Sequence, residues 1–310
     1  MDREPGQDHI TLFLCGDVML GRGIDQIMPH PSDPTLYEAY VTSALGYVRL
    51  AERAHGPIPR KCAYDYVWGD ALADLEAARP HARIINLETS ITTSTSPQPK
   101  GINYKMHPEN VPCLKAALVD CCVLANNHVL DWGREGLLET LAVLQRENIL
   151  IAGAGLDQAE AEKPAAIGLP EGRRVLVFGV GAVTSGIPQD WAAGKSEAGV
   201  SLLPDLSLAS ASKLAERIIA TRGPGDLVVV SIHWGSNWGY HVPEEQRAFA
   251  HALVDAGACD VLHGHSAHHP RGLEVYRERL ILYGCGDFIT DYEGISGWEQ
   301  YRGDLSLMYL

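Results

Sequence analysis

The sequence has no stretch that approaches the roughly 18 consecutive apolar residues that a membrane-spanning helix needs. Its N-terminal residues also lack the basic stretch followed by an apolar core that is typical of a secretory signal. Positive charge is scarce, because 25 Lys and Arg residues stand against 39 Asp and Glu residues and give a formal net charge of −14. Nucleic acids and membranes are therefore not expected as partners, since an anionic partner requires a basic surface.

Several kinds of catalytic motif are also missing. The seven cysteines are scattered and form no C-x-x-C pair. Most lie in apolar, strand-like segments, where a free thiol behaves as a small hydrophobic side chain. The sequence has no G-x-S-x-G motif and no glycine-rich loop with the spacing of a nucleotide site. We expect a cytoplasmic protein with reduced thiols, no covalent nucleophile and no organic cofactor.

Short apolar runs alternate with helical patterns along the chain. The expected strands are 10–16, 83–87, 120–125, 149–153, 174–183, 226–232 and 258–263, and the expected helices are 66–78, 109–118, 135–147, 206–221 and 244–256. Two further runs, 273–276 and 280–284, flank a short charged connection and predict a hairpin. The alternation predicts an α/β fold with a mixed sheet, in which residues 1–310 form a single domain.

Three long segments without a regular pattern interrupt this alternation. They comprise residues 19–64, 90–107 and 184–204. Irregular connections of this length are uncommon in compact domains and usually have a function, such as covering a site. We therefore expect these loops to lie over the functional site.

Polar residues gather at the carboxyl ends of the expected strands. They are Asp17, Asn86, Glu88, Asn126, Asn127, His128, His233, His263, His265, His268 and Asp287. Ligand sites in α/β proteins lie beyond the carboxyl ends of strands, so these residues should meet at one edge of the sheet. Oxygen and imidazole donors that converge without a partner are costly to bury, and a bound metal ion explains them best.

These segments resemble the ordered motifs of a known family. Gly16-Asp17-Val18-Met19-Leu20, Asn86-Leu87-Glu88, Asn126-Asn127-His128, His233-Trp234-Gly235 and Gly264-His265 to His268 are similar, in this order, to motifs of the CapA-like (poly-γ-glutamate capsule synthesis) family of the calcineurin-like metallophosphatase superfamily. The resemblance implies a calcineurin-like four-layer α/β/β/α sandwich with the site at one edge of its sheets. It also implies metal ligands at Asp17, Glu88, Asn127, His233 and His265, and a substrate contact or proton donor at His128.

The sequence departs from the superfamily pattern at three positions. Met19 stands where the pattern has a histidine, and Glu88 stands where it has a bridging aspartate. The second histidine of the last motif is displaced by one residue, to His268. The remaining donors favour a single oxygen-rich divalent ion, Ca²⁺ or Mn²⁺, over a zinc or iron centre.

Histidine–aspartate pairs suggest acid–base chemistry at such a site. A carboxylate orients the imidazole and stabilises its cation, and the expected pairs are His128 with Asp131 and His268 (or His265) with Asp287. Two pairs on opposite sides of a Cα–H could invert that centre, and the resemblance extends to a peptide epimerase of lasso-peptide biosynthesis. We therefore expect an epimerase that acts on a ribosomal peptide. The alternatives are a metallophosphoesterase or poly-γ-glutamate-processing amide hydrolase, and a noncatalytic binding protein.

Substrate contacts are expected from basic and aromatic residues near these motifs. Arg22 and Lys105 rank first among the cations, ahead of Lys100 and Arg134, because their segments should fold over the site and bind a carboxylate or phosphate. Trp234 and Trp238, followed by Tyr240, could form a platform for an apolar side chain. Each also has an ordinary alternative, since most such cations are solvated and most tryptophans pack in a core.

Overall fold

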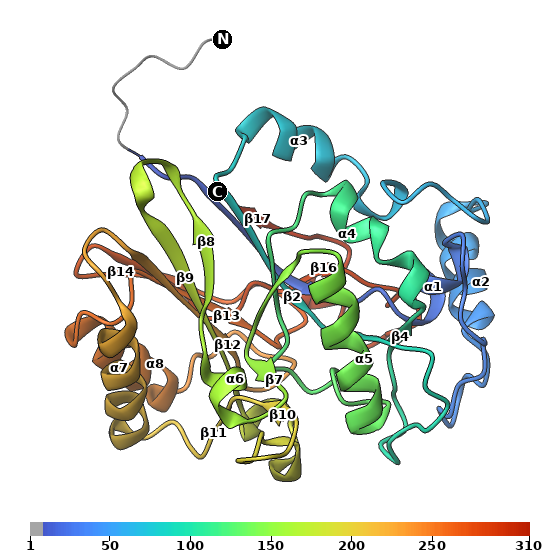
Figure 1. The fold of residues 1–310 in the computed structure, drawn as a ribbon. Coiled ribbons are helices and arrows are strands. Elements are labelled where there is room, and N and C mark those ends of the chain that lie inside the picture. The colour runs from blue at the N-terminus through green and yellow to red at the C-terminus, as the bar shows by residue number, and fades with distance from the viewer. Residues whose placement is uncertain (1–8) are drawn as a thin grey trace.

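The computed structural model describes residues 9–310 and contains two large mixed sheets (Figure 1). The first sheet has the order β16 (Asp287–Ile289), β1 (Leu12–Val18), β2 (Ala82–Leu87), β5 (Cys121–Val123) and β6 (Leu150–Ala152), and β17 (Met308–Tyr309) also pairs with β1. The second has the order β11 (Leu202–Leu203), β9 (Arg174–Ala182), β12 (Leu227–His233), β13 (Val261–His265), β15 (Arg279–Leu282) and β14 (Leu273–Tyr276), and β8 (Ala165–Gly168) pairs with β9. Most neighbours are parallel, whereas β8, β14 and β17 pair antiparallel. The predicted α/β class with mixed sheets and a terminal hairpin is confirmed.

Helices cover the outer faces of the two sheets. Figure 1 shows α7 (Leu208–Thr221) and α8 (Glu244–Asp255) beside the second sheet, and α3 (Ala71–Ala78), α4 (Pro112–Ala116) and α5 (Gly133–Arg146) on the opposite side of the molecule. The remaining helices are α1 (Arg22–Ile27), α2 (Leu45–His55) and α6 (Gln158–Glu162). Two short pairs, β3 (Ser90–Ile91) with β4 (Lys105–Met106) and β7 (Ala154–Gly155) with β10 (Gly199–Val200), lie outside the large sheets.

Three hydrophobic cores show how these layers stack. Successive side chains of a strand point to opposite faces, so each buried strand contributes to two cores. In β2, Ile84 packs in the core between the sheets, whereas Ile85 packs with the helices of the first layer. In β12, Val229 joins the core between the sheets, whereas Val230 packs with Leu214 of α7 and other residues of the last layer. This alternation produces the predicted four-layer sandwich of the calcineurin-like type.

The segment 19–64 is more regular than the sequence suggested. It contains α1 and α2, and in α2 the side chains of Tyr47, Val48 and Ala51 form one buried face. The other two expected loops are also partly ordered, because β3 and β4 lie within 90–107 and β10 and β11 lie within 184–204. These strands are too short to carry a recognisable period of hydrophobicity. β3 and β4 pair with each other, whereas β10 and β11 pair with the distant strands β7 and β9.

A close approach of two glycines brings β1 and β16 together beside the site. A Cβ atom on Gly16 would lie 1.7 Å from the carbonyl oxygen of Gly286, so no larger residue fits there without a shift. Gly286 itself has a φ of +79°, a conformation that favours glycine. The approach sets the register in which Asp17 pairs with both Asp287 and Asn86. Among the described residues, no helix has the length and apolar character needed to cross a bilayer.

Candidate metal and acid–base site

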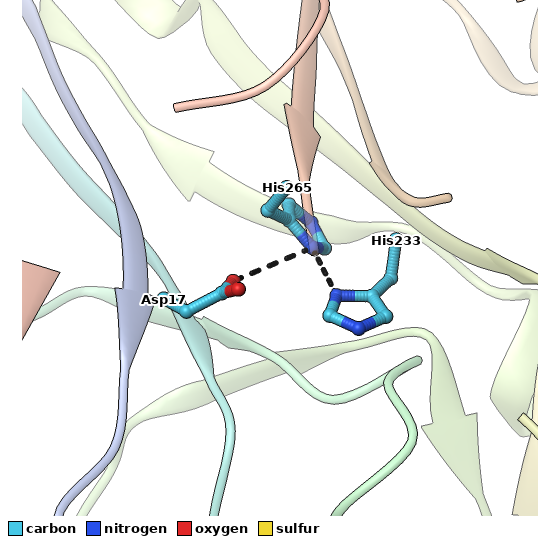
Figure 2. A group of neighbouring side chains, drawn as sticks. All are labelled: Asp17, His233 and His265. Carbon is cyan, nitrogen blue, oxygen red and sulfur yellow. Dashed lines mark hydrogen bonds and ion pairs between the residues drawn. The ribbon is translucent and has the colours of Figure 1, made fainter. Parts of the chain in front are cut away.

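The strand ends meet where the two sheets adjoin. β1 and β2 of the first sheet bring Asp17 and Glu88, while β12 and β13 of the second bring His233 and His265 in register. Figure 2 shows Asp17, His233 and His265 pointing toward one another. All three are buried, and their candidate ligand atoms lie within 4.8 Å of one another. The structure therefore brings together the convergence of donors that the strand ends predicted.

A chain of hydrogen bonds determines which nitrogen of His265 carries the proton and which presents a lone pair to this group. His263 Nε2 lies 2.6 Å from the carbonyl oxygen of Cys15, which can only accept, so the proton of a neutral His263 is on Nε2. Ser231 Oγ then donates to His263 Nδ1 at 3.0 Å and accepts from His265 Nε2 at 2.9 Å. His265 Nδ1 is left with its lone pair, 3.9 Å from Asp17 Oδ1. Burial, as the largest cause, lowers the pKa of His263 to about 4 and that of His265 well below its usual value, so both rings are neutral.

With Asn127 Oδ1 facing its Nε2, a neutral His233 cannot satisfy both of its neighbours, although a turn of the Asn127 amide that presents its NH₂ would also allow it. Its Nδ1 lies 2.8 Å from His265 Nδ1, and its Nε2 lies 3.0 Å from Asn127 Oδ1 and 3.7 Å from Glu88 Oε1. A neutral imidazole has one N–H, so one of these contacts joins two lone pairs. Burial lowers the pKa of His233 well below its usual value, which disfavours the doubly protonated ring. A cation among these lone pairs removes the conflict.

The carboxylates indicate the same need for positive charge. Glu88 Oε2 is buried without a hydrogen-bond partner among the described residues. Burial and then repulsion from Asp17 and Asp287 raise the pKa of Glu88 well above its usual value. Burial, followed by repulsion from Asp287, raises the pKa of Asp17 to about 7, although Asn86 donates a hydrogen bond to Asp17 Oδ1 at 2.7 Å. The donors thus fit a divalent cation, as the family resemblance implies. Met19 faces its own loop, where its sulfur accepts a hydrogen bond from the Gly21 amide.

Two His–Asp pairs border the metal group. His128 Nδ1 lies 2.6 Å from Asp131 Oδ2, and His268 Nδ1 lies 3.1 Å from both oxygens of Asp287. Both histidines line a cavity of about 220 Å³ together with Glu88 and Asn127. Of the two partners considered for Asp287, the structure selects His268, because His265 is engaged by Ser231.

The two imidazoles experience opposite electrostatic effects. Burial is the largest influence on His128, and with the nearby Lys100 cation it outweighs Asp131 and lowers the pKa to about 4. Burial also acts against the charged form of His268, but the charge of Asp287 and its hydrogen bond outweigh it and raise the pKa. One cavity thus holds a histidine that favours its neutral form and a histidine that favours its cation.

Lys100, a lower-ranked candidate from the sequence, and Tyr104, which the sequence did not single out, both line the cavity. Lys100 Nζ donates to Asp131 Oδ1 at 2.7 Å and to the carbonyl oxygen of Asn127. The ring of Tyr104 stacks on His128 with centroids 3.9 Å apart, and its hydroxyl lies 2.8 Å from that of Tyr292. Both residues come from segment 90–107, which contributes to the cavity wall, and Lys100 had been ranked below Lys105.

The expected substrate contacts are divided between the cavity walls and the core. Lys105 Nζ lies 3.7 Å from the ring centroid of Trp132 and donates to the carbonyl oxygen of Ser94, so it does not line the cavity. Trp234 is buried in the core of the second sheet, where its Nε1 donates to the carbonyl oxygen of Tyr283. Arg22 and Trp238 line a larger, adjoining cavity. The spacing of residues in the sequence did not distinguish side chains that line a cavity from those that do not, because this depends on how the surrounding segments fold.

Comparisons with known proteins give the family. Residues 11–292 match the model of the family described as "Bacterial capsule synthesis protein PGA_cap". The chain is 49% identical, over 305 residues, to the "Probable polyglutamine synthesis accessory protein" of Mycobacterium tuberculosis, covering 98% of this chain and 80% of that protein. It is 28% identical over 304 residues to the "PGA biosynthesis protein CapA" of Bacillus subtilis, covering 97% of this chain and 68% of that protein. The chain therefore belongs to the PGA_cap family of bacterial capsule synthesis proteins.

Proposed function

We propose that this protein is a metal-dependent hydrolase that cleaves an amide bond in a peptide-like chain. The observation that carries the proposal is the presence of two His–Asp pairs, His128–Asp131 and His268–Asp287, around the candidate metal ligands. The printed names of the relatives support the choice of substrate, because polyglutamine is an amide-linked chain.

The metal would be held by the converging donors of both sheets. Asp17, His233 and His265 form the converging group, and Glu88 and Asn127, which lie beside His233 Nε2, would complete the ligand set. A divalent cation bound there would supply Lewis acidity to a carbonyl oxygen. Three oxygen donors and two imidazoles suit Mn²⁺ better than Ca²⁺, which takes oxygen ligands almost entirely. Elemental analysis of the purified protein tests this assignment, and zinc as the stoichiometric metal would contradict it.

The imidazoles would carry the protons. Hydrolysis requires one group to take a proton from water as its oxygen joins the carbonyl carbon, and another to give a proton to the nitrogen as the C–N bond breaks. Each Nδ1 is directed to an aspartate, so the transfers would use the Nε2 atoms of His128 and His268. His268 Nε2 lies 3.0 Å from the side-chain amide nitrogen of Asn237, and substrate would replace that contact. Asp131 also accepts hydrogen bonds from Lys100 and from the backbone of Tyr104, so its orientation is well defined.

Mass spectrometry in labelled water tests the proposal. Blocked oligomers of glutamine and of α- and γ-linked glutamate are incubated with the protein and Mn²⁺ in H₂¹⁸O. The expected result is shorter products that carry one ¹⁸O in the new carboxylate and disappear on chelation. If none of the oligomers is cleaved with Mn²⁺, Ca²⁺ or Zn²⁺ present, the proposal is wrong.

Inversion at a peptide Cα is the second candidate. The existence of two separate His–Asp pairs favours it, because one pair could remove the Cα proton and the other could return a proton to the opposite face. The same oligomers incubated in D₂O distinguish the two reactions. Deuterium at one Cα without cleavage supports inversion, whereas cleavage without deuterium at carbon excludes it.

A phosphoester substrate receives less support from the charges of the cavity. Lys100 and a protonated His268 are the cations among the described residues that line it, and they are already paired with Asp131 and Asp287. A phosphate group would therefore depend on the metal for most of its charge compensation. Turnover of p-nitrophenyl phosphate with Mn²⁺ is the measurement that would restore this alternative.

A further inference from the structure

We propose that the catalytic cavity continues into a second cavity that binds an aromatic side chain of the substrate. We call this second space, of about 410 Å³, the aromatic cavity; its walls include Tyr40, Tyr47, Tyr104, Trp238, Tyr292 and Trp298. The inference rests on the proposed function and extends it, since the peptide-like chain would carry an aromatic residue, and not only glutamine or glutamate, beside the reacting amide bond. Its volume falls within the roughly 300–1,000 Å³ that is typical of ligand sites.

The two cavities adjoin each other along a shared wall. Ile102, Tyr104, Asn237 and His268 line both of them. A chain whose reacting group lies beside His268 therefore has its adjacent side chain within reach of the aromatic cavity. Residues from both segment 19–64 and the C-terminal segment after β16 complete the walls, so the space exists only in the folded molecule.

Aromatic side chains of the walls contact one another. The rings of Trp238 and Trp298 stack with centroids 5.0 Å apart and an interplanar angle of 2°. Trp238 also lies 5.3 Å from the ring of His268, which connects the aromatic wall to the catalytic pair. Rigid aromatic faces offer a large contact area at little entropic cost, and they favour flat or apolar groups.

Charge in the aromatic cavity disfavours an acidic side chain. Its cation, Arg22, is paired with Glu38 and Asp291 and lies 3.8 Å from the ring centroid of Tyr47. These pairs neutralise the guanidinium, so a substrate carboxylate would be desolvated without a free counter-ion among the described lining residues. Arg22 Nε is buried and has no acceptor among the described residues, so it could donate to one neutral carbonyl oxygen. The cavity thus fits an uncharged aromatic residue with its backbone carbonyl.

Equilibrium binding tests this inference separately from catalysis. The probes are three blocked tripeptides, acetyl-Gly-X-Gly-amide with Trp, Gln or Glu at X, titrated by NMR against the protein without added metal. We expect the Trp peptide to bind most tightly and the Glu peptide most weakly. Trp298→Ala should weaken binding of the Trp peptide by about threefold to tenfold, as expected for the loss of one aromatic contact.

Two further variants make the result specific. Tyr40→Ala removes a wall residue that is 70% exposed, so its loss should not affect folding, and it should also weaken the Trp peptide. Tyr66→Ala is the matched control, because Tyr66 is 45% exposed and lies outside the aromatic cavity. The dissociation constant of this variant for the Trp peptide should equal that of the native chain.

The outcomes separate this inference from the proposed function. Equal affinity for the three peptides, or the same affinity in Trp298→Ala, Tyr40→Ala and the native chain, would overturn it even if oligomers are cleaved. Selective binding of the Trp peptide that depends on Trp298 would support it even if no amide bond is ever cleaved.

Discussion

The two sheets contribute side chains to one candidate site, and these side chains differ in how well their polar atoms are hydrogen-bonded. From the second sheet, His265 belongs to a hydrogen-bonded chain that passes through Ser231 and His263 to the Cys15 carbonyl. From the first sheet, Glu88 has a buried oxygen without a partner, and the pKa of its carboxyl is raised by burial. The imidazole side is thus oriented by the protein itself, whereas the carboxylate side has an unsatisfied oxygen that a bound cation would compensate. If a metal binds here, we expect the second sheet to set the geometry of the site and the first sheet to supply the negative charge.

The largest effect should be a loss of catalytic rate on removal of either imidazole of the two His–Asp pairs. His128→Ala and His268→Ala should each lower kcat by about 10²–10⁴-fold, because each removes one proton-transfer group, while metal content stays unchanged. Initial rates on the cleaved oligomer and elemental analysis measure the two quantities. His251→Ala, which changes a histidine bound to Glu274 at the surface, is the control. Full activity in both variants would show that neither histidine transfers a proton in the reaction.

Removing the oriented imidazole should abolish metal binding. His265→Ala deletes the lone pair that the hydrogen-bonded chain directs at Asp17. We expect the dissociation constant for Mn²⁺, measured by calorimetry, to rise by at least about 100-fold, which is the upper end of the effect of outer-sphere partners. Unchanged affinity would mean that the metal lies elsewhere.

Ser231→Ala should have a smaller effect on the same quantity. The hydroxyl does not face the metal group but holds the tautomer of His265, so affinity for Mn²⁺ should fall by about 10–100-fold. In the metal-free variant, ¹⁵N chemical shifts should show that His265 loses its single tautomer. Ser210→Ala is the matched control, because this serine is also buried but is bonded to Asp205. If the His265 shifts are the same in Ser231→Ala and the native chain, the orienting role is refuted.

The smallest effect should be a change in the stability of the metal-free protein when Glu88 is replaced. Glu88→Gln replaces a charge that is unfavourable when buried, so the chelated protein should become more stable by about 1–3 kcal/mol at neutral pH, measured by urea unfolding. The pKa of Glu88 is raised in the folded state, so the stability of the native chain falls as pH rises above about 4.3, the usual pKa of glutamate. The difference in unfolding free energy between Glu88→Gln and the native chain should therefore grow over the same range. Lower stability of the variant throughout this range would show that Glu88 is stabilised without a cation.

The sequence was sufficient to predict the strands and the layered arrangement of the fold. Runs such as those of β2 and β12 are apolar on both faces, which is typical of strands buried between two layers, and the turns between them were placed within a few residues. It did not reveal α1 and α2, because their buried faces are short and their stability comes from packing against the C-terminal segment.

The site was predictable wherever it depended on strand ends, and unpredictable wherever it depended on loops. Asp17, Glu88, His233 and His265 converge because parallel strands end at one edge, which is a property of the alternation itself. Lys100 and Lys105 lie five positions apart in one segment, yet only Lys100 reaches the Asp131 pair, because β4 carries Lys105 to Trp132. No local pattern distinguishes the two.

By itself, the order of residues determined the class of fold, the strands that deliver ligands, and the chemical character of the donors. Only the tertiary structure decided the partner of Asp287, the tautomer of His265 and the burial of Trp234. The physical reason is that periodicity is a local property of the chain, whereas a hydrogen bond between positions such as 15 and 263 depends on how distant segments pack.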